Sequence, residues 1–223
     1  MRLCTFNIKH AEIAGLAAIE RELRATQADV IALQEVDART TRAGGVHQAE
    51  SLGAALGLHA AFAPAFSLEG GHYGVALLSS WPITAQAPIF LPRCEPPRDE
   101  ARVALGAQTG GWHFFVTHLS LDGDERALQA RALAARIGEG AEKAICCGDF
   151  NESVAAPGVR ALLATGLRDA WSDCGAGEQI TAAPDRPRER VDLVLLGTAL
   201  HATNVEVRPT TASDHPLVIV EIA

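Results

Sequence analysis

Short apolar runs alternate along the chain with segments whose apolar residues recur at helical spacing. Residues 12–26 show that spacing and are predicted to form an amphipathic helix. Further helices are predicted at residues 47–56, 122–137 and 157–164. The apolar runs predict strands at residues 2–8, 29–33, 58–66, 73–80, 83–91, 102–108, 112–117, 143–147, 191–196, 203–208 and 217–222.

Turn-forming residues divide these runs at short intervals. The pairs Gly70-Gly71 and Trp81-Pro82 separate three successive runs, which predicts antiparallel strands, and a hairpin is expected around residues 110–111. Loops are expected at residues 38–45, 92–100 and 172–189. Because no internal repeat, low-complexity tract or linker interrupts the pattern, residues 1–223 are predicted to form one domain.

Composition is typical of a globular protein, with 48% hydrophobic and 21% charged residues. No apolar run is long enough to span a bilayer, and the first residues resemble a strand rather than a signal peptide. The five cysteines lack metal-binding spacing, so we expect reduced, apolar packing residues. These features predict a cytoplasmic protein without membrane insertion, and we take a monomer as the default.

A net charge of -8 argues against a protein that coats nucleic acid. Arginines in the predicted loops could nevertheless form a cationic entrance for a phosphorylated substrate, if these loops share one rim. The alternative is that they are solvated loop charges. The arginines concerned are Arg39, Arg42, Arg93, Arg98, Arg186, Arg188 and Arg190.

The candidate chemistry centres on Gly148-Asp149-Phe150-Asn151, which follows a predicted buried strand. Side chains at positions i and i+2 of a strand end point to the same side, so Asp149 and Asn151 can face one cleft. Carboxylate and amide oxygens suit a hard divalent cation and an activated water. Taken alone, the four residues favour an ordinary turn, since Gly, Asp and Asn are common turn residues.

Other polar residues interrupt or follow apolar runs in the same way. Each could be a turn, a cap or a satisfied structural side chain, but a shared cleft explains all of them together. These residues are Asn7, Glu35, His118, Asp192, Asp214 and His215.

Seven short motifs carry these residues in a recognisable order. They are Thr5-Phe6-Asn7-Ile8, Leu33-Gln34-Glu35-Val36, Tyr73-Gly74-Val75-Ala76-Leu77-Leu78-Ser79, Thr117-His118-Leu119, Gly148-Asp149-Phe150-Asn151, Arg190-Val191-Asp192 and Ser213-Asp214-His215. This order resembles the endonuclease/exonuclease/phosphatase superfamily of DNase I-like metal-dependent phosphoesterases, in the form of a small bacterial-type single-domain member. The resemblance implies a four-layer α/β sandwich of two packed mixed β-sheets flanked by helices. It also implies Mg²⁺ or Mn²⁺ and hydrolysis of a phosphate ester.

The resemblance also implies roles for individual residues. The metal ligands would be Asn7, Glu35, Asp149 and Asp214. Asp149 would also orient and deprotonate the attacking water, with Asn151 holding water or phosphate. His118 would donate to a phosphate oxygen, and His215 would pair with Asp192, which sets its tautomer.

Four further residues are predicted to contact substrate, namely Arg42, His72, Tyr73 and Arg102. For Arg102 a structural salt bridge is an equal alternative. The chain departs from its relatives at Ser80-Trp81-Pro82, where they commonly carry an arginine, and this removes one expected phosphate contact.

The sequence therefore predicts a divalent-metal phosphodiesterase or phosphatase acting on a small or lipid-derived phosphate ester. The alternative is a nuclease with little sequence preference. It is the second hypothesis because the chain shows no inserted basic or aromatic element that would grip nucleic acid, although arginines occur in the predicted loops. A catalytically silent binding domain on the same fold is the third possibility, and the complete set of polar residues argues against it.

Overall fold

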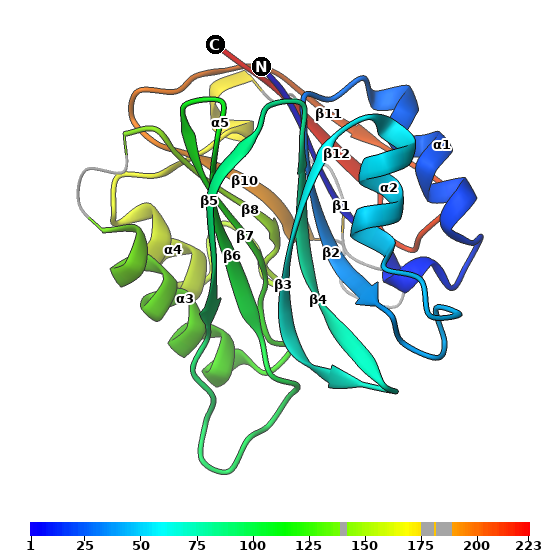
Figure 1. Cartoon of the computed structure of the whole chain (residues 1–223). Coiled ribbons are helices and arrows are strands. Elements are labelled where there is room, and N and C mark those ends of the chain that lie inside the picture. The colour runs from blue at the N-terminus through cyan, green and yellow to red at the C-terminus, as the bar shows by residue number, and fades with distance from the viewer. Residues whose placement is uncertain (139–141, 175–180, 182–188) are drawn as a thin grey trace.

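Two six-stranded sheets lie face to face in the computed structural model, which describes residues 1–138, 142–174, 181 and 189–223 (Figure 1). The first sheet, in spatial order, contains β11 (Ala202–Arg208), β12 (Leu217–Ile222), β1 (Arg2–Asn7), β2 (Val30–Ala38), β4 (Gly71–Ser79) and β3 (His59–Leu68). The second contains β5 (Ile83–Phe90), β6 (Val103–Thr109), β7 (Trp112–His118), β8 (Ala144–Asp149), β10 (Asp192–Leu196) and β9 (Arg168–Asp169). Both sheets are mixed, because the pairs β1–β2 and β7–β8 are parallel while their other pairs are antiparallel.

Both ends of the chain belong to the first sheet. Strand β1 pairs with β12, and the amino group of Met1 donates to the carbonyl oxygen of Ile222 at 2.8 Å. The second sheet is built from residues 83–196, which follow one another in sequence. The termini therefore lie side by side, at the top of Figure 1.

Helices cover the outer faces of the sheets and complete four layers. Helices α1 (Leu16–Thr26) and α2 (Gln48–Leu56) flank the first sheet, while α3 (Gly123–Ile137) and α4 (Pro157–Leu163) flank the second (Figure 1). Short helical turns occur at Lys9–Ala11 and Trp171–Cys174. The four-layer α/β sandwich predicted from the sequence is confirmed.

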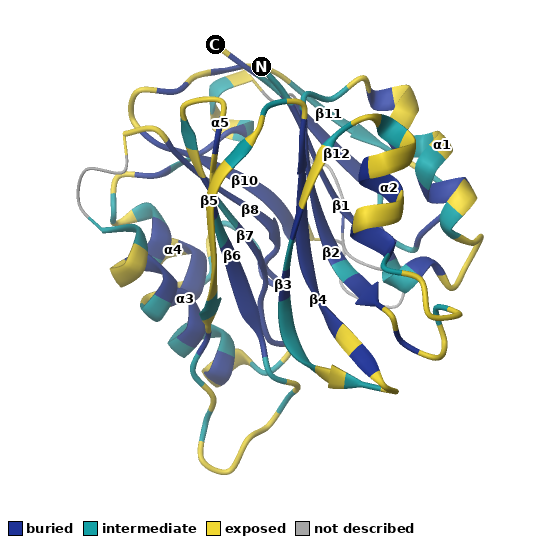
Figure 2. Cartoon of the chain, in the orientation of Figure 1, coloured by how far each residue is buried: buried dark blue, intermediate teal, exposed yellow. Residues whose placement is uncertain are grey.

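The apolar pattern of the strands divides into three cores, dark blue in Figure 2. Successive side chains of β1 point to opposite faces, so Leu3 lies between the sheets while Cys4 packs against the outer helices. In the second sheet Cys147 faces the first sheet and Cys146 faces α3 and α4. All five cysteines are free, and Cys4, Cys146 and Cys147 are buried, as expected of apolar packing residues.

Element boundaries differ from the prediction at a few places. The first helix begins at Leu16 rather than at residue 12, because residues 9–11 form a tight turn with positive φ angles before it. The two-residue strand β9 was not predicted. The predicted loop at residues 172–189 contains the end of the Trp171–Cys174 helix, and most of the rest lies outside the described residues. Within the described part of the chain, no helix has the length and apolar character needed to cross a membrane.

Candidate active site

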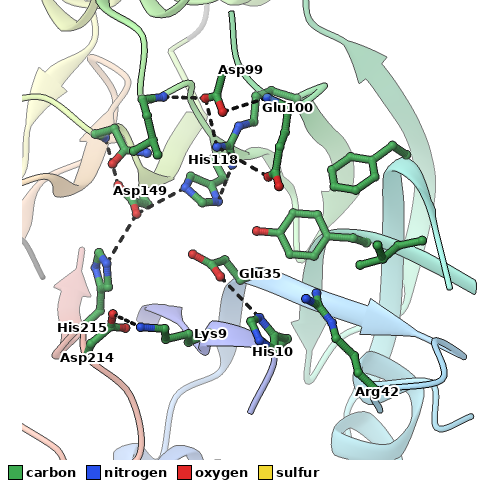
Figure 3. Close-up of a pocket in the computed structure, with 16 residues that line it drawn as sticks. Lys9, His10, Glu35, Arg42, Asp99, Glu100, His118, Asp149, Asp214 and His215 are labelled. Atoms are coloured by element: carbon green, nitrogen blue, oxygen red, sulfur yellow. Dashed lines mark hydrogen bonds and ion pairs between the residues drawn. The ribbon is translucent and has the colours of Figure 1, made fainter. Parts of the chain in front are cut away.

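A pocket of about 450 Å³ opens where the two sheets meet (Figure 3). The first sheet and the segments joined to it contribute Lys9, His10, Glu35, Arg42, Phe66, Leu68, Tyr73, Asp214 and His215. The second sheet and its adjoining segments contribute Asp99, Glu100, Arg102, His118, Leu121, Asp149 and Asn151. The site therefore requires both sheets.

Strand pairing places the central side chains of the second sheet next to one another. His118 and Asp149 are the last residues of β7 and β8, and they are direct neighbours in the parallel register. On the other side of β8, Asp192 begins β10 and lies opposite Asp149. The three polar side chains thus form a row across one edge of this sheet, although they are far apart in sequence.

Glycine at position 148 allows this edge to form. Gly148 has a φ of 141°, and a Cβ there would overlap the carbonyl oxygen of Thr117 on the neighbouring strand. Any larger residue would therefore separate β8 from β7. The glycine before Asp149 maintains the spacing of the two strands that carry His118 and Asp149.

Glu35 reaches the pocket in a different way from that predicted. The sequence suggested that the strand ends at Leu33, but β2 continues to Ala38 with a register shift between Leu33 and Val36. Glu35 lies in this bulge with a φ of 55°. A bulge redirects one side chain while pairing resumes beyond it, which is how Glu35 reaches the pocket from the middle of a strand.

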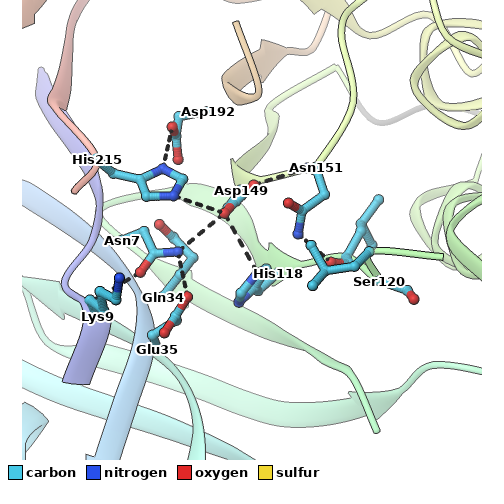
Figure 4. A network of polar contacts seen from close by, with 12 residues as sticks. Asn7, Lys9, Gln34, Glu35, His118, Ser120, Asp149, Asn151, Asp192 and His215 are labelled. Carbon is cyan, nitrogen blue, oxygen red and sulfur yellow. Dashed lines mark hydrogen bonds and ion pairs between the residues drawn. The ribbon is translucent and has the colours of Figure 1, made fainter. Parts of the chain in front are cut away.

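Asp149 is the centre of a polar network (Figure 4). Its Oδ1 accepts a hydrogen bond from the backbone N–H of Asn151 at 2.9 Å. Its Oδ2 accepts from Asn7 Nδ2 at 3.1 Å and lies 3.5 Å from His118 Nε2 and 3.7 Å from His215 Nε2. Burial and the nearby Asp192 carboxylate raise the pKa of Asp149 to about 6. This carboxylate is therefore a stronger base than an exposed aspartate.

Asn7 joins the two principal carboxylates. It is fully buried, and its Nδ2 donates both to Glu35 Oε1 at 3.0 Å and to Asp149 Oδ2 at 3.1 Å. Its Oδ1 accepts from the backbone N–H of Lys9 at 3.0 Å. Burial alone would raise the pKa of Glu35, but the His10 imidazole 3.6 Å away, the nearby His118 and a hydrogen bond from Asn7 hold it well below its usual range. Glu35 is consequently an anion at any physiological pH.

His215 and Asp192 form the pair that the resemblance implied. His215 Nδ1 lies 2.9 Å from Asp192 Oδ2, which leaves Nε2 directed toward Asp149. Burial lowers the pKa of His215, but the Asp192 carboxylate outweighs this effect and raises it to about 9. Asp192 is 1% exposed, and its backbone N–H donates to Thr181 Oγ1 at 2.8 Å.

Sequence reasoning missed seven residues that line the pocket, namely Lys9, His10, Phe66, Leu68, Asp99, Glu100 and Leu121. Two of them contact predicted site residues from the segment after Asn7: Lys9 Nζ contacts Asp214 Oδ2 at 2.7 Å, and His10 Nδ1 lies 3.6 Å from Glu35 Oε2. Lys9 and His10 are two and three residues beyond Asn7, in the turn with positive φ angles. Proximity to Asn7 was the only available indication, because nothing in the local pattern predicts that turn.

The four predicted substrate contacts have different positions. Arg42 and Tyr73 line the pocket, with the Arg42 guanidinium 5.7 Å from the centre of the Tyr73 ring. Arg102 also lines it but is only 4% exposed. His72 is exposed and is not among the lining residues, because its side chain points to the opposite face of β4 from Tyr73.

The described residues favour solvated loop charges over a cationic rim. Of the loop arginines that the structure describes, only Arg42 lines the pocket, and its guanidinium is held by Asp37 through contacts of 2.6 and 2.8 Å. The other described loop arginines are bound elsewhere or point away: Arg39 is 71% exposed, Arg93 binds the Asp99 carbonyl oxygen, Arg98 pairs with Asp124, and Arg190 pairs with Asp169. Arg186 and Arg188 lie outside the described residues.

The charge balance of the pocket suits a divalent cation. Five carboxylates line it against three permanently cationic side chains, each of which already contacts a carboxylate. An anionic ester would be repelled unless a cation were bound. Glu35 and Asp149 offer oxygen ligands, which fit Mg²⁺ or Mn²⁺. Asp149, Asp192 and His215 also bring three ligand atoms within 4.8 Å of one another, but the Asp192–His215 hydrogen bond already uses two of them.

Comparisons with known proteins identify the family and the fold. The sequence model of the endonuclease/exonuclease/phosphatase family matches residues 4–215. A family protein from Beutenbergia cavernae has a TM-score of 0.81 and 22% identity, covering 100% of this chain and 71% of that one. The fold is shared by the mannosyl-6-phosphatase Bt3783 of Bacteroides thetaiotaomicron, with a TM-score of 0.72 and 17% identity, covering 100% of this chain and 99% of that one. It is also shared by the human Nocturnin catalytic domain, with a TM-score of 0.75 and 20% identity, covering 100% of this chain and 93% of that one. No curated protein matches the chain in sequence. The chain belongs to the endonuclease/exonuclease/phosphatase family, whose members are divalent-metal-dependent hydrolases of phosphate esters.

Proposed function

We propose that the protein uses Mg²⁺ or Mn²⁺ to hydrolyse a small or lipid-derived phosphate ester. The observation that carries this proposal is the meeting of three groups at Asp149 Oδ2, where Asn7 donates and the Nε2 atoms of His118 and His215 lie within 3.7 Å. A basic carboxylate next to two imidazoles can accept a proton from water beside a phosphate group.

The metal would be held by Glu35 and Asp149, with Asp214 able to share it once Lys9 moves from its 2.7 Å contact. When bound, the ion would neutralise phosphate oxygens and make a nearby water more acidic. Asn7 was predicted as a ligand, but its amide nitrogen holds both carboxylates and its amide oxygen accepts from Lys9 N–H. We therefore assign Asn7 the task of positioning the two carboxylates.

The remaining residues would handle protons and phosphate. Asp149 would accept the proton of the attacking water, and Asn151, whose Nδ2 donates to the Leu119 carbonyl oxygen at 2.8 Å, would hold water or phosphate from a fixed position. His118 would donate to a phosphate oxygen. His215, held by Asp192 at Nδ1, would direct Nε2 toward the reacting group.

The shape of the pocket favours a small substrate. Its volume of about 450 Å³ lies in the range of about 300–1,000 Å³ that is usual for small-molecule sites. Phe66, Leu68 and Leu121 give it apolar walls that suit the organic part of an ester. The absence of an arginine rim among the described residues weakens the nuclease alternative. A cytoplasmic location and a monomeric state stay predictions.

The test is a substrate panel with purified protein in Mg²⁺, Mn²⁺ or EDTA. It includes an aryl monophosphate, a bis-aryl phosphate, inositol phosphates, phospholipid vesicles and plasmid DNA. We expect metal-dependent release from a small or lipid ester, reduced about 10²–10⁴-fold in Asp149→Asn. Asp124→Asn is the matched control, since Asp124 is 76% exposed and is not among the residues that line the pocket. Efficient plasmid nicking with no turnover of the other substrates would favour the nuclease instead, and activity that persists in Asp149→Asn would refute the assignment.

A further inference from the structure

The Arg102 guanidinium is directed at His118 rather than at the open pocket. Arg102 immediately precedes β6 and is 4% exposed. Its Nη1 lies 3.1 Å from His118 Nδ1, and its Nη2 lies 3.2 Å from Asp99 Oδ2. Both terminal nitrogens therefore contact protein groups, and the Asp99 contact is the structural salt bridge that was the alternative to a phosphate contact.

This contact determines which nitrogen of His118 carries the proton. A guanidinium has five N–H donors and no acceptor, so Nδ1 of His118 must accept the hydrogen bond. In a neutral imidazole the proton then resides on Nε2. The position of the other ring nitrogen agrees with this arrangement, because Nε2 lies 3.5 Å from the carboxylate oxygen Oδ2 of Asp149, which is an acceptor.

We propose that Arg102 is a positioning residue that fixes His118 as the Nε2–H tautomer, so that this imidazole presents a hydrogen-bond donor to the substrate. The proposal rests on the proposed function, because a non-bridging phosphate oxygen can only accept. The opposite tautomer would turn a lone pair toward that oxygen and would repel it.

The support for Arg102 extends beyond the pocket. Asp99 Oδ2 also accepts from Ser120 Oγ and from the backbone N–H of Leu121, each at 2.7 Å. The loop that carries Asp99 is held in turn by Glu125 of α3, a fully buried carboxylate that accepts from two backbone N–H groups of the loop at 3.2 and 2.7 Å. Asp99 is therefore a fixed anion that keeps the guanidinium pointed at Nδ1.

Nitrogen NMR of the histidine side chains reads the tautomer directly. In ¹⁵N-labelled protein, long-range ¹H–¹⁵N correlations distinguish a protonated ring nitrogen from an unprotonated one. The chain has eight histidines, and the signals lost in His118→Gln identify those of His118. We expect a protonated Nε2 and an unprotonated Nδ1, with and without Mg²⁺. A proton on Nδ1 in the unaltered protein would overturn the proposal.

Substitutions connect the tautomer to turnover. Arg102→Met should shift the His118 Nδ1 signal and lower kcat by about 10-fold to 100-fold, with little change in KM. This reduction in kcat is somewhat smaller than the reduction of about 10²–10³-fold that follows complete loss of such a donor. Arg102→Lys keeps one donor and should restore the nitrogen pattern and part of kcat. Arg39→Met is the control, because Arg39 is 71% exposed and outside the pocket.

The outcomes separate this proposal from the proposed function. Unchanged His118 nitrogen signals and kcat in Arg102→Met would refute the positioning role while leaving the hydrolase intact. If no phosphate ester on the panel is turned over, the proposed function fails, yet the spectrum of the unaltered protein still decides the tautomer. The same spectrum decides it if Arg102→Met does not fold.

Discussion

The contacts of Asn7 lead to a quantitative prediction about the substitution Asn7→Asp. The change keeps the shape of the side chain but replaces the amide nitrogen, which donates to Glu35 and Asp149, with an acceptor oxygen. Three carboxylates would then converge in a site where Asn7 is fully buried. The variant should therefore lose the bridge between the two sheets and gain a repulsion.

The expected cost in unfolding free energy has two contributions. Hydrogen bonds to charged groups contribute about 1.5–3 kcal/mol each, so losing two of them costs about 3–6 kcal/mol of unfolding free energy. The repulsion between the carboxylates adds to this cost, but by no more than the free energy of protonating the new carboxyl group. With an unfolded pKa of about 3.9, this limit is about 5.6 kcal/mol at pH 8, because each pH unit contributes about 1.4 kcal/mol.

The same reasoning gives the direction of the pH dependence. In the folded variant the pKa of the cluster is raised above its unfolded value, since the neutral acid is favoured. The part of the destabilisation that comes from repulsion is therefore absent below the unfolded pKa and grows as pH rises toward the folded pKa. At pH 6 the limit falls to about 2.9 kcal/mol, so the variant should regain stability relative to the unaltered protein when pH is lowered from 8 to 6.

Urea unfolding in EDTA at pH 8 and pH 6 measures both quantities. Asn204→Asp is the matched control, because Asn204 is exposed on β11 and should change stability by no more than about 0.5 kcal/mol. A loss below about 1 kcal/mol at pH 8, or a loss that grows as pH falls, would show that Asn7 does not bridge the carboxylates.

Two further predictions concern the scaffold of the site. Gly148→Ala should largely abolish folding, seen as loss of soluble protein, because the new Cβ would overlap the Thr117 carbonyl oxygen. The control Gly123→Ala should fold normally, because its Cβ meets only the end of a flexible side chain. Equal yields of soluble protein for the two variants would contradict the prediction. Phe114→Ala, at a fully buried position between the sheets, should cost about 3–5 kcal/mol in urea unfolding, while Phe90→Ala at a 68% exposed position should cost less than about 1 kcal/mol. Similar losses for the two phenylalanines would refute the assigned core.

The family resemblance implied the sandwich, while sequence patterning located the polar residues at the strand ends for a definite physical reason. Asn7, His118 and Asp149 each end a strand, so the apolar runs before them mark their positions. Asp149 and Asn151 both line the pocket, as the argument from positions i and i+2 required. Asn151, however, is not in an extended strand conformation, because its own φ is 52°. Local pattern thus indicated where these side chains occur, without showing the backbone path between them.

The rest depended on features that local sequence does not encode. Glu35 is presented by a bulge inside a continuous strand, and nothing in Leu33-Gln34-Glu35-Val36 distinguishes a bulge from a strand end. Arg102 contacts His118, 16 residues away, and Lys9 contacts Asp214, 205 residues away. Pairing over such sequence distances follows from sheet register and loop placement. Substrate choice depends on similar long-range details.

The layout of the chain also determines how it could be rearranged. The first sheet is built from both ends of the sequence, and the second from one uninterrupted stretch, residues 83–196. Because Met1 and Ile222 already pair, a short linker could join the termini, and the chain could be reopened near the exposed Ser80 and Pro82. In such a circular permutant each sheet would be encoded contiguously. Cutting it between the two stretches would then give two fragments, neither active alone, whose recovered activity would measure sheet association.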